Sequence, residues 1–464
     1  MPGLPVTLDR NISRAVYGTG LATSLGMRAI LILLLLGCTT SADPDLGDSA
    51  MIDAATNDAD PRADAGEADA GETDASEADA GPRADAGETD AGETDTGSDA
   101  ESDAGAMERP DPLALEGYGA VSVGGAGGDR CMVTTLANDG PGSLRACIDE
   151  RTGTGESVVP RIIEFAIGGT ILLESDIVID EPYLTIDGYT APAPGITIVK
   201  RTMRDGEMII AGRRTGLHPH DLIVRYLRFD GVWDGREEHD QNTATITIDG
   251  ENNPEGVYRV VLDHLAFVRA SDGSPDFWGN VRDVTLSWSL LHHSLHPTTI
   301  SHSGTEQTRE RISLHHNVYA YNHERNPQVR GRVRNLDIVN DVVFAWRIFG
   351  GGYGIRLRER GSVVPTDVSL VGNFFASDEV PGSALLLSPT DYPGDVYLED
   401  NVFPVGRDED FRTVETPPAT PPEAGVTRYP VDELAERMLP YVGLPVRTEE
   451  EEATFAAIAA AMSR

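Results

Sequence analysis

The stretch Leu314-His315-His316-Asn317-Val318-Tyr319 decides the fold, because similar stretches recur along the second half of the chain. Each copy alternates apolar residues of strand type and then turns at a small or amide-bearing residue, which indicates a strand and a corner, not a helical face. The corner residues form a column whose successive differences are 24, 28, 24, 32 and 28 positions: Leu265, Ser289, Asn317, Asp341, Asn373 and Asn401. Ile186–Tyr189 and Val224–Leu227 fit the pattern upstream at a spacing of 38, which indicates longer loops there.

The repeat predicts an all-β solenoid. A unit of this length cannot bury its own apolar face, whereas units stacked along one axis share a continuous core and have few free edges. Asn and Asp suit the corners because their side chains tolerate tight turns and can hydrogen-bond to a neighbouring coil. We therefore expect a parallel β-helix over residues 113–405. An ordinary β-sandwich with coincidental spacing is the alternative.

The N-terminus has the features of an export signal. Met27-Arg28 precedes the apolar run Ala29–Leu36 and then Gly37-Cys38, and this run is too short to span a membrane. It resembles a bacterial lipoprotein signal over residues 1–38, which implies a lipid on Cys38 and makes Met27 a candidate start. We expect an exported protein that is attached to a bacterial membrane or cell surface only by this lipid, or is secreted. A buried strand ending in Cys is the alternative.

Residues 39–112 form a low-complexity run rich in Asp, Glu, Ala, Gly and Thr. High like charge with few aromatic or branched apolar residues cannot offset the entropy of the chain, so we expect a disordered acidic linker. This run carries about half of the formal net charge of −39, so the overall acidity says little about the folded domain. A protein that binds nucleic acid needs a basic surface, which this acidic chain does not suggest, so we expect no nucleic-acid partner.

A different composition follows the repeat. Residues 406–464 contain two segments of helical character, Val431–Met438 and Glu449–Met462. We expect a short C-terminal helical appendage that lies on or caps the solenoid and is not a second catalytic domain.

Cysteine and lysine are scarce. In an exported chain Cys131 and Cys147 could form one disulfide, and two buried thiols are equally compatible with the sequence. Lys200 is the only lysine, so cationic chemistry must fall to Arg or His.

The heptapeptide Glu324-Arg325-Asn326-Pro327-Gln328-Val329-Arg330 sets two arginines five positions apart, across a proline, directly after a strand-like segment. Arginine is permanently charged, and its planar fork matches a carboxylate. Two arginines held by a stiff turn can therefore grip an anionic polymer in one geometry. A solvated ion-pair cluster with Glu324 is the alternative.

Several motifs follow one another along the chain: Gly117-Tyr118-Gly119-Ala120, the run Val133–Arg145, Leu262-Asp263-His264, and His315–Ala320 leading into Glu324–Arg330. Together and in this order they resemble the pectate lyase family, polysaccharide lyase family 1. The resemblance covers roughly residues 117–405. It implies a right-handed, single-stranded parallel β-helix and cleavage of polygalacturonate by β-elimination.

Roles carry over by position. The resemblance implies that Arg325 is the catalytic arginine, that Arg330 binds the substrate carboxylate, and that His296 stands where a substrate-binding lysine is common. It also implies Ca²⁺ as cofactor, with Asp272 and Asp276 as ligands and Asp240 as an earlier ligand. Further substrate-binding candidates are Trp278, His323 and Glu324. We expect a monomer that acts on an acidic plant-type polysaccharide.

Three alternatives stay open. A non-catalytic β-helix could bind acidic glycans as a surface lipoprotein. A hydrolase would need paired carboxylates, for which Asp263 and Asp272 are candidates. Eight histidines between His264 and His323 invite a zinc site, but they lack compact ligand spacing, so stacking or corner hydrogen bonds are the favoured interpretation.

Overall fold

The computed structural model describes residues 114–464, except for 213–216, 237–243, 252, 302–306, 308, 332, 347, 350–351, 359–366, 378–384, 388–394, 404–412 and 419–420. Four predicted features lie outside the described residues: the export signal, the lipidation site Cys38, the acidic linker and the calcium ligand Asp240.

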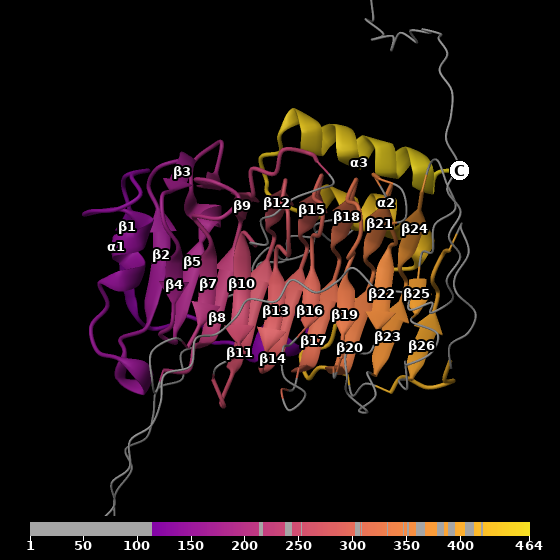
Figure 1. Cartoon of the computed structure of the whole chain (residues 1–464), viewed down its shortest axis with the longest axis horizontal. Coiled ribbons are helices and arrows are strands. Elements are labelled where there is room, and N and C mark those ends of the chain that lie inside the picture. Colours follow the sequence, from indigo (N-terminus) through magenta and orange to yellow (C-terminus); the bar gives the residue numbers. More distant parts are fainter. Residues whose placement is uncertain are drawn as a thin grey trace, which may run out of the picture. The chain divides into compact units, whose positions relative to one another are not determined.

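The described strands stack into a parallel solenoid with three sheets, so the β-helix prediction is confirmed and the β-sandwich alternative is wrong (Figure 1). Each coil crosses sheet A, then sheet B, then sheet C, and every strand pairs in parallel with its counterpart in the next coil. Sheet A comprises β1 (Asp129–Val133), β2 (Arg161–Phe165), β5 (Leu184–Asp187), β8 (His220–Arg225), β11 (Val257–Asp263), β14 (Val281–Ser287), β17 (Arg309–His315), β20 (Val333–Val339), β23 (Val368–Val371) and β26 (Val396–Glu399).

The other two sheets have eight described strands each. Sheet B comprises β3 (Gly169–Leu173), β6 (Ile196–Lys200), β9 (Leu227–Asp230), β12 (Ala266–Val268), β15 (Leu290–His292), β18 (Val318–Ala320), β21 (Val342–Phe344) and β24 (Phe374–Ala376). Sheet C comprises β4 (Ile177–Ile179), β7 (Met208–Ala211), β10 (Ile246–Gly250), β13 (Asp276–Gly279), β16 (Thr299–Ser301), β19 (Gln328–Arg330), β22 (Ile355–Arg358) and β25 (Leu385–Leu387).

The core consists of apolar rows that run along the solenoid axis. In-register pairing places each apolar side chain beside an apolar side chain of the next coil. The buried row of sheet A is an example: Val224, Leu262, Leu286, Leu314, Ile338 and Leu370. Each fully buried Leu or Ile stabilises the fold by about 2 kcal/mol. The repeat therefore sets the register as well as the fold, because a slip by one residue would turn the apolar row outward.

The predicted column forms a hydrogen-bonded ladder at the corner between sheets A and B. Each backbone N–H donates to the side chain of the next column residue, from Leu265 to Ser289 Oγ at 3.0 Å and onward to Asn401 at 2.8 to 3.0 Å. The tight turn itself lies one residue earlier than predicted. His264, Trp288 and His316 take the left-handed conformation there, with φ of 50°, 49° and 57°. Their rings stack in register (4.2 Å between the Trp288 and His316 centroids).

The first described segment runs across the outer face of sheet A. It includes η1 (Tyr118–Val121), whose first two N–H groups donate to Ser313 Oγ and Thr285 Oγ1 on strands far along the chain. A Cβ at Gly119 would lie 2.4 Å from the carbonyl oxygen of Val260. The glycine-rich motif is thus explained by close backbone contact with the sheet.

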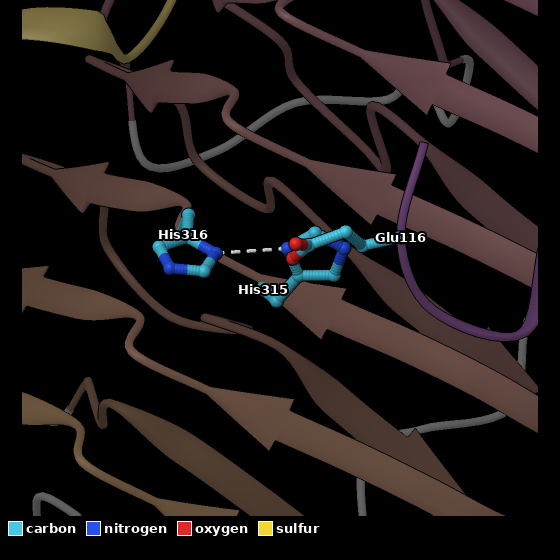
Figure 2. A group of neighbouring side chains, drawn as sticks. All are labelled: Glu116, His315 and His316. Carbon is cyan, nitrogen blue, oxygen red and sulfur yellow. Dashed lines mark hydrogen bonds between the residues drawn. The ribbon is translucent and has the colours of Figure 1, made fainter. Parts of the chain in front are cut away.

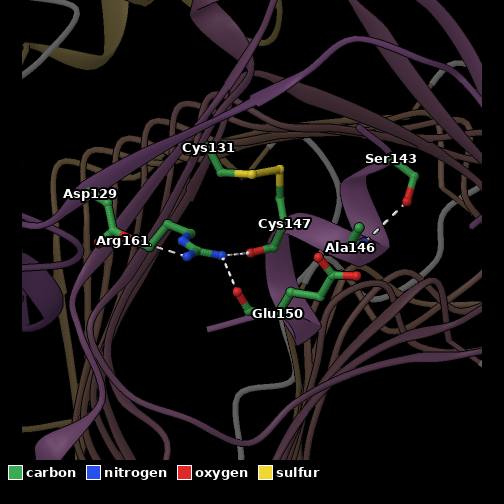
Figure 3. The surroundings of a disulfide bond; sticks show 7 residues. All are labelled: Asp129, Cys131, Ser143, Ala146, Cys147, Glu150 and Arg161. Carbon is green, nitrogen blue, oxygen red and sulfur yellow. Dashed lines mark hydrogen bonds and ion pairs between the residues drawn. A yellow bond between two sulfur atoms is a disulfide. The ribbon is translucent and has the colours of Figure 1, made fainter. Parts of the chain in front are cut away.

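A disulfide between Cys131 and Cys147 joins β1 to α1 (Leu144–Asp149) at the first end of the solenoid, so of the two possibilities that the sequence left open the structure has the bonded pair (Figure 3). Ser143 caps α1 by accepting from Ala146 N–H, and the Arg161 guanidinium donates to the carbonyls of Cys147 and Glu150 at 2.9 Å. α1 is followed by the short turn η2 (Gly155–Ser157), and η3 (Gly188–Thr190) follows β5. The disulfide and the Arg161 hydrogen bonds hold α1 over the open end of the core.

The C-terminal helices pack on the outer face of sheet B, as the expected appendage (Figure 1). They are η4 (Val431–Glu433), α2 (Leu434–Arg437), η5 (Leu439–Tyr441) and α3 (Glu449–Met462). Arg228 forms a two-pronged ion pair with Glu451 at 2.8 and 2.7 Å, in addition to the apolar contacts. Within the described chain, we find no helix with the combined length and apolarity needed to span a membrane.

Candidate active site

Three consecutive turns between sheets B and C carry the predicted polar residues. Asp272 lies in the turn 269–275, His296 in the next turn, 293–298, and both Glu324 and Arg325 in the third, 321–327. Because neighbouring coils are about 4.8 Å apart, side chains from these turns can meet. Residues spread over 53 positions of sequence thus share one flank of the solenoid.

The four side chains form one connected polar network. Arg325 Nη1 donates to Asp272 Oδ1 at 2.8 Å, and it lies 3.4 Å from Thr299 Oγ1. His296 lies between two carboxylates, with Nε2 at 3.3 Å from Glu324 Oε1 and Nδ1 at 3.6 Å from Asp272 Oδ1. The Arg325 side chain is only 18% exposed, so the alternative of a solvated ion-pair cluster with Glu324 is wrong.

The local backbone explains the position of Arg325. Arg325 has φ of 65°, and its carbonyl accepts from Thr298 N–H at 3.1 Å in the preceding coil. Two buried amides brace the same turn, since Asn322 Nδ2 donates to Asn326 Oδ1 at 3.0 Å and Asn326 Nδ2 to Tyr353 O at 3.2 Å. The turn is therefore held from both neighbouring coils.

The outer face of sheet C continues the site. Thr299 on β16 is paired with Asp276 on one side and with Gln328 on the other. Asp276 Oδ1 accepts from Thr299 N–H at 2.8 Å, and Gln328 Oε1 accepts from Arg330 Nε. Arg330 and Trp278 lie two positions further along their strands, so they share this face. Asp272, Asp276, Arg325 and Arg330 thus gather on one flank as predicted.

Charge and burial shift the pKa values of these groups. Burial alone would raise the pKa of Asp272, but contacts with His296 and Arg325 outweigh it and lower the pKa to about 2. Burial and the neighbouring Asp272 charge raise the pKa of Asp276 well above its usual value. Burial would lower the pKa of Arg325, yet Asp272, Tyr353 and Glu324 raise it. The unliganded site therefore holds Arg325 as a cation.

The acidic pair fits a calcium ion. Asp272 and Asp276 come from one turn and its following strand, and they present hard carboxylate oxygens of the kind Ca²⁺ prefers. A Cβ at Gly273 would lie 1.5 Å from Asp276 Oδ1, so only glycine allows the Asp276 carboxylate to fold back over this turn. The raised pKa of Asp276 indicates a carboxylate that lacks compensating positive charge, which a cation would supply.

Two predicted substrate-binding residues have other partners. His323 is buried, and its Nδ1 accepts from Phe349 N–H at 3.3 Å, so its ring supports a neighbouring turn. Glu324 contacts His296 and Arg325, which suits a carboxylate that orients cations better than one that faces an acidic polymer. Trp278 remains on the outer face, where its indole N–H donates to Glu251.

The residues of the hydrolase alternative lie apart. Asp263 is buried at the corner between sheets A and B, where it accepts from Ser287 Oγ at 2.6 Å and contacts His264 at 2.7 Å. Asp272 lies at the other side of sheet B. The two carboxyl groups therefore do not flank one bond.

Two histidine pairs with a nearby carboxylate could hold a metal ion among the described residues. One is Glu116, His315 and His316, drawn in Figure 2, and the other is His292, His293 and Glu450. In each pair the Nδ1 atoms lie 2.9 Å apart. A metal on both Nδ1 atoms would leave both buried Nε2–H groups of His315 and His316 without an acceptor in the described chain. A hydrogen-bonded pair fits better, in agreement with the sequence prediction.

Sequence reasoning missed Thr299, whereas it already set Lys200 aside as the only lysine. Thr299 joins Arg325 to Asp276, and only the register of sheet C reveals it. Lys200 is buried, and its Nζ donates to Ala244 O at 2.6 Å. Burial lowers the pKa of Lys200 to about 8, although Glu207 and Asp176 oppose the shift. Arg and His therefore supply the accessible cations of this flank.

Known proteins are similar to this chain in sequence and in fold. No family model matches the chain. A probable pectate lyase C of Emericella nidulans is 33% identical over 238 residues, which cover 51% of this chain and 48% of that protein. A probable pectate lyase 22 of Arabidopsis thaliana is 26% identical over 301 residues, which cover 61% of this chain and 62% of that protein.

The sequence similarity is thus to curated pectate lyases, over about half of this chain. A solved structure shares the fold of this chain: jun a 1, the major allergen from cedar pollen, has a TM-score of 0.51 and 17% identity, covering 71% of this chain and 92% of the allergen. The chain spans about half the length of the first curated relatives that it matches. These relatives are fungal and plant proteins, and the bacterial lipoprotein assignment stays a prediction.

Proposed function

We propose that this chain is a polysaccharide lyase that cleaves polygalacturonate by β-elimination. The network of Asp272, His296, Glu324 and Arg325 on one flank of the solenoid carries this proposal. The relationship to curated pectate lyases supports it.

Arg325 would act as the base. It would remove the proton on the carbon next to the substrate carboxylate, after which the glycosidic oxygen leaves and an unsaturated sugar remains. Because Asp272 keeps Arg325 protonated in the unliganded site, this role requires that Asp272 be engaged elsewhere when substrate is bound. Asp272 and Asp276 would hold Ca²⁺, which would neutralise the substrate carboxylate and favour negative charge on the adjacent carbon.

The other residues would bind the substrate or orient the charged groups of the site. Arg330 would receive a substrate carboxylate with its planar fork, and Trp278 offers an indole face on the same sheet. His296 would act as a positioning residue, since it contacts both Asp272 and Glu324. A non-catalytic glycan-binding protein is the second candidate, and the named relatives do not favour it.

Export and attachment extend the proposal. The apolar run that ends at Gly37-Cys38 supports a lipoprotein with Cys38 lipidated, active as a monomer at a cell surface. Metabolic labelling with a radioactive fatty acid would test it. Label on the wild type and not on Cys38→Ala is expected, and equal label on both would refute it.

The decisive experiment measures unsaturated product by its ultraviolet absorbance, with polygalacturonate and Ca²⁺. Arg325→Ala should lower kcat/KM by about 1,000-fold. Arg334→Ala is the matched control, because Arg334 is exposed on sheet A, away from the site, and should retain activity. A wild type that binds the polymer without forming product would favour the glycan-binding alternative.

A further inference from the structure

Two aromatic residues from distant coils meet beside the site. Trp233 follows β9 and Phe349 follows β21, which are four strand positions apart in sheet B. Four steps amount to roughly 19 Å along the axis, yet the two ring centroids lie 6.2 Å apart in a nearly perpendicular arrangement. Both residues must therefore reach along the solenoid toward one another.

The coils that this pair bridges are those of the site. The strands between β9 and β21 are β12, β15 and β18, and the turns after them carry Asp272, His296 and Arg325. The Trp233–Phe349 pair, called the bridge below, therefore runs beside all three turns. Its two residues come from the coils on either side of them.

Each end of the bridge is fastened to one of the bridged turns. Trp233 N–H donates to Arg269 O at 2.8 Å, in the turn that holds Asp272. Phe349 N–H donates to His323 Nδ1 at 3.3 Å, and the two rings lie 5.2 Å apart, in the turn that holds Arg325. The indole N–H of Trp233 donates to Arg236 O at 2.9 Å, so this side chain is satisfied while 6% exposed.

We propose that Trp233 and Phe349 are positioning residues that form an aromatic wall along the sheet B side of the site. The wall fixes the spacing of the three turns and keeps water away from the Arg325–Asp272 ion pair on that side, which strengthens their interaction. The acidic polymer then lies over sheet C, where Asp276, Trp278 and Arg330 are found. This inference rests on the proposed function of the same site.

The chemistry explains why a wall matters here. Arg325 must meet one carbon of the substrate, and a displacement of about 1 Å in a reacting group lowers a rate by about 100-fold. The wall contacts His323, which is two positions from Arg325. Its other hydrogen bonds in the described part of the chain are to Arg269 and Arg236, which lie in turns and not on sheet C. Its loss should therefore affect kcat far more than KM.

The test compares Phe349→Ala, Phe349→Tyr and Ile348→Ala in the full chain, with Ca²⁺ and polygalacturonate. Ile348 is the neighbouring exposed apolar residue and serves as the matched control. We expect Phe349→Ala to lower kcat by about 30-fold with KM changed less than about twofold. Phe349→Tyr keeps the ring and should restore most of kcat, and Ile348→Ala should match the wild type. A kcat for Phe349→Ala within about twofold of wild type would overturn the proposal.

Hydrogen exchange separates this inference from the proposed function. Phe349→Ala, and independently Trp233→Phe, should speed amide exchange in residues 321–327 and leave the strands of sheet A unchanged. If the wild type forms no product, the proposed function fails, and the wall is still judged by this exchange. Unchanged exchange in 321–327 in both variants would refute the wall whatever the activity.

Discussion

The two corners on either side of sheet B differ in almost every respect. At the corner with sheet A, the connection has two residues in each of five successive coils: 264–265, 288–289, 316–317, 340–341 and 372–373. At the corner with sheet C, successive connections are 231–245, 269–275, 293–298, 321–327 and 345–354. The first corner carries the amide ladder, and the second carries the candidate active site.

This contrast teaches where a solenoid keeps its regularity and where it can vary. The ladder forces equal connections, because each side chain must reach the N–H of the neighbouring coil. The other corner is held by individual contacts such as Arg325–Asp272, so its turns can change in length and in charge. Variants at the first corner should therefore affect stability, and variants on the flank of the second should affect activity.

The largest effect is expected from Asn317→Ala in the ladder. Its side chain accepts from Ser289 N–H and donates to Leu286 O, both at 3.0 Å, and both partners would be left buried and unpaired. The free energy of unfolding should fall by about 3 kcal/mol in urea titrations. Asn401→Ala, at the half-buried end of the ladder, should lower the free energy of unfolding by less. Equal losses at both positions would argue against a cooperative ladder.

Arg330→Gln should weaken substrate binding and leave the stability of the fold unchanged. The change removes a charged fork from the outer face of sheet C, where Arg358 is its partner in register. We expect KM for polygalacturonate to rise about 30-fold, equivalent to about 2 kcal/mol of binding, since hydrogen bonds to charged groups are worth this much. Thermal unfolding should stay unchanged. An unaltered KM would exclude Arg330 from substrate binding.

Asp341→Asn should stabilise the fold by about 1.5 kcal/mol at pH 7. Asp341 stands where its neighbours are Asn, and burial raises its pKa well above the usual value. Because the folded pKa is raised, ionisation opposes folding, so the wild type loses stability as pH rises from about 4 through the folded pKa. The variant should lack this loss and can donate to Leu314 O, as Asn373 does to Ile338 O.

Measurements of the free energy of unfolding between pH 4 and 8 would test the direction of this pH dependence. The two proteins should converge in acid and diverge toward neutrality. A variant that is less stable than the wild type at pH 7 would show that the carboxyl group has a compensating partner.

The sequence predicts the regular corner better than the site. Asn317 and Asn373 recur at spacings that only a stacked corner explains, so fold, register and ladder follow from local pattern. The sequence left open whether Cys131 and Cys147 form a disulfide or stay as thiols, and only the structure decides this. The clustering of Arg325 with Asp272 was predicted through family resemblance, because no local periodicity relates residues 53 positions apart.

Other features depend on contacts that local sequence does not encode. Trp288 takes the left-handed turn because its neighbours in the ladder require it, although a bulky residue such as Trp rarely adopts that conformation. The meeting of Trp233 with Phe349 depends on how far two irregular turns reach along the axis. The pairing of Glu324 with His296 likewise appears only once coil order is known.

The path of the first described segment has a mechanical consequence. This segment starts beside β17 and runs back to β2, and it bonds in turn to Ser313, Thr285, Asp221 and Thr185. Tension applied at Glu116 along the solenoid axis would load this row of hydrogen bonds in shear, instead of opening them one at a time. A molecule held by its N-terminal end could then resist drag from a polymer without transmitting the force to its first coil.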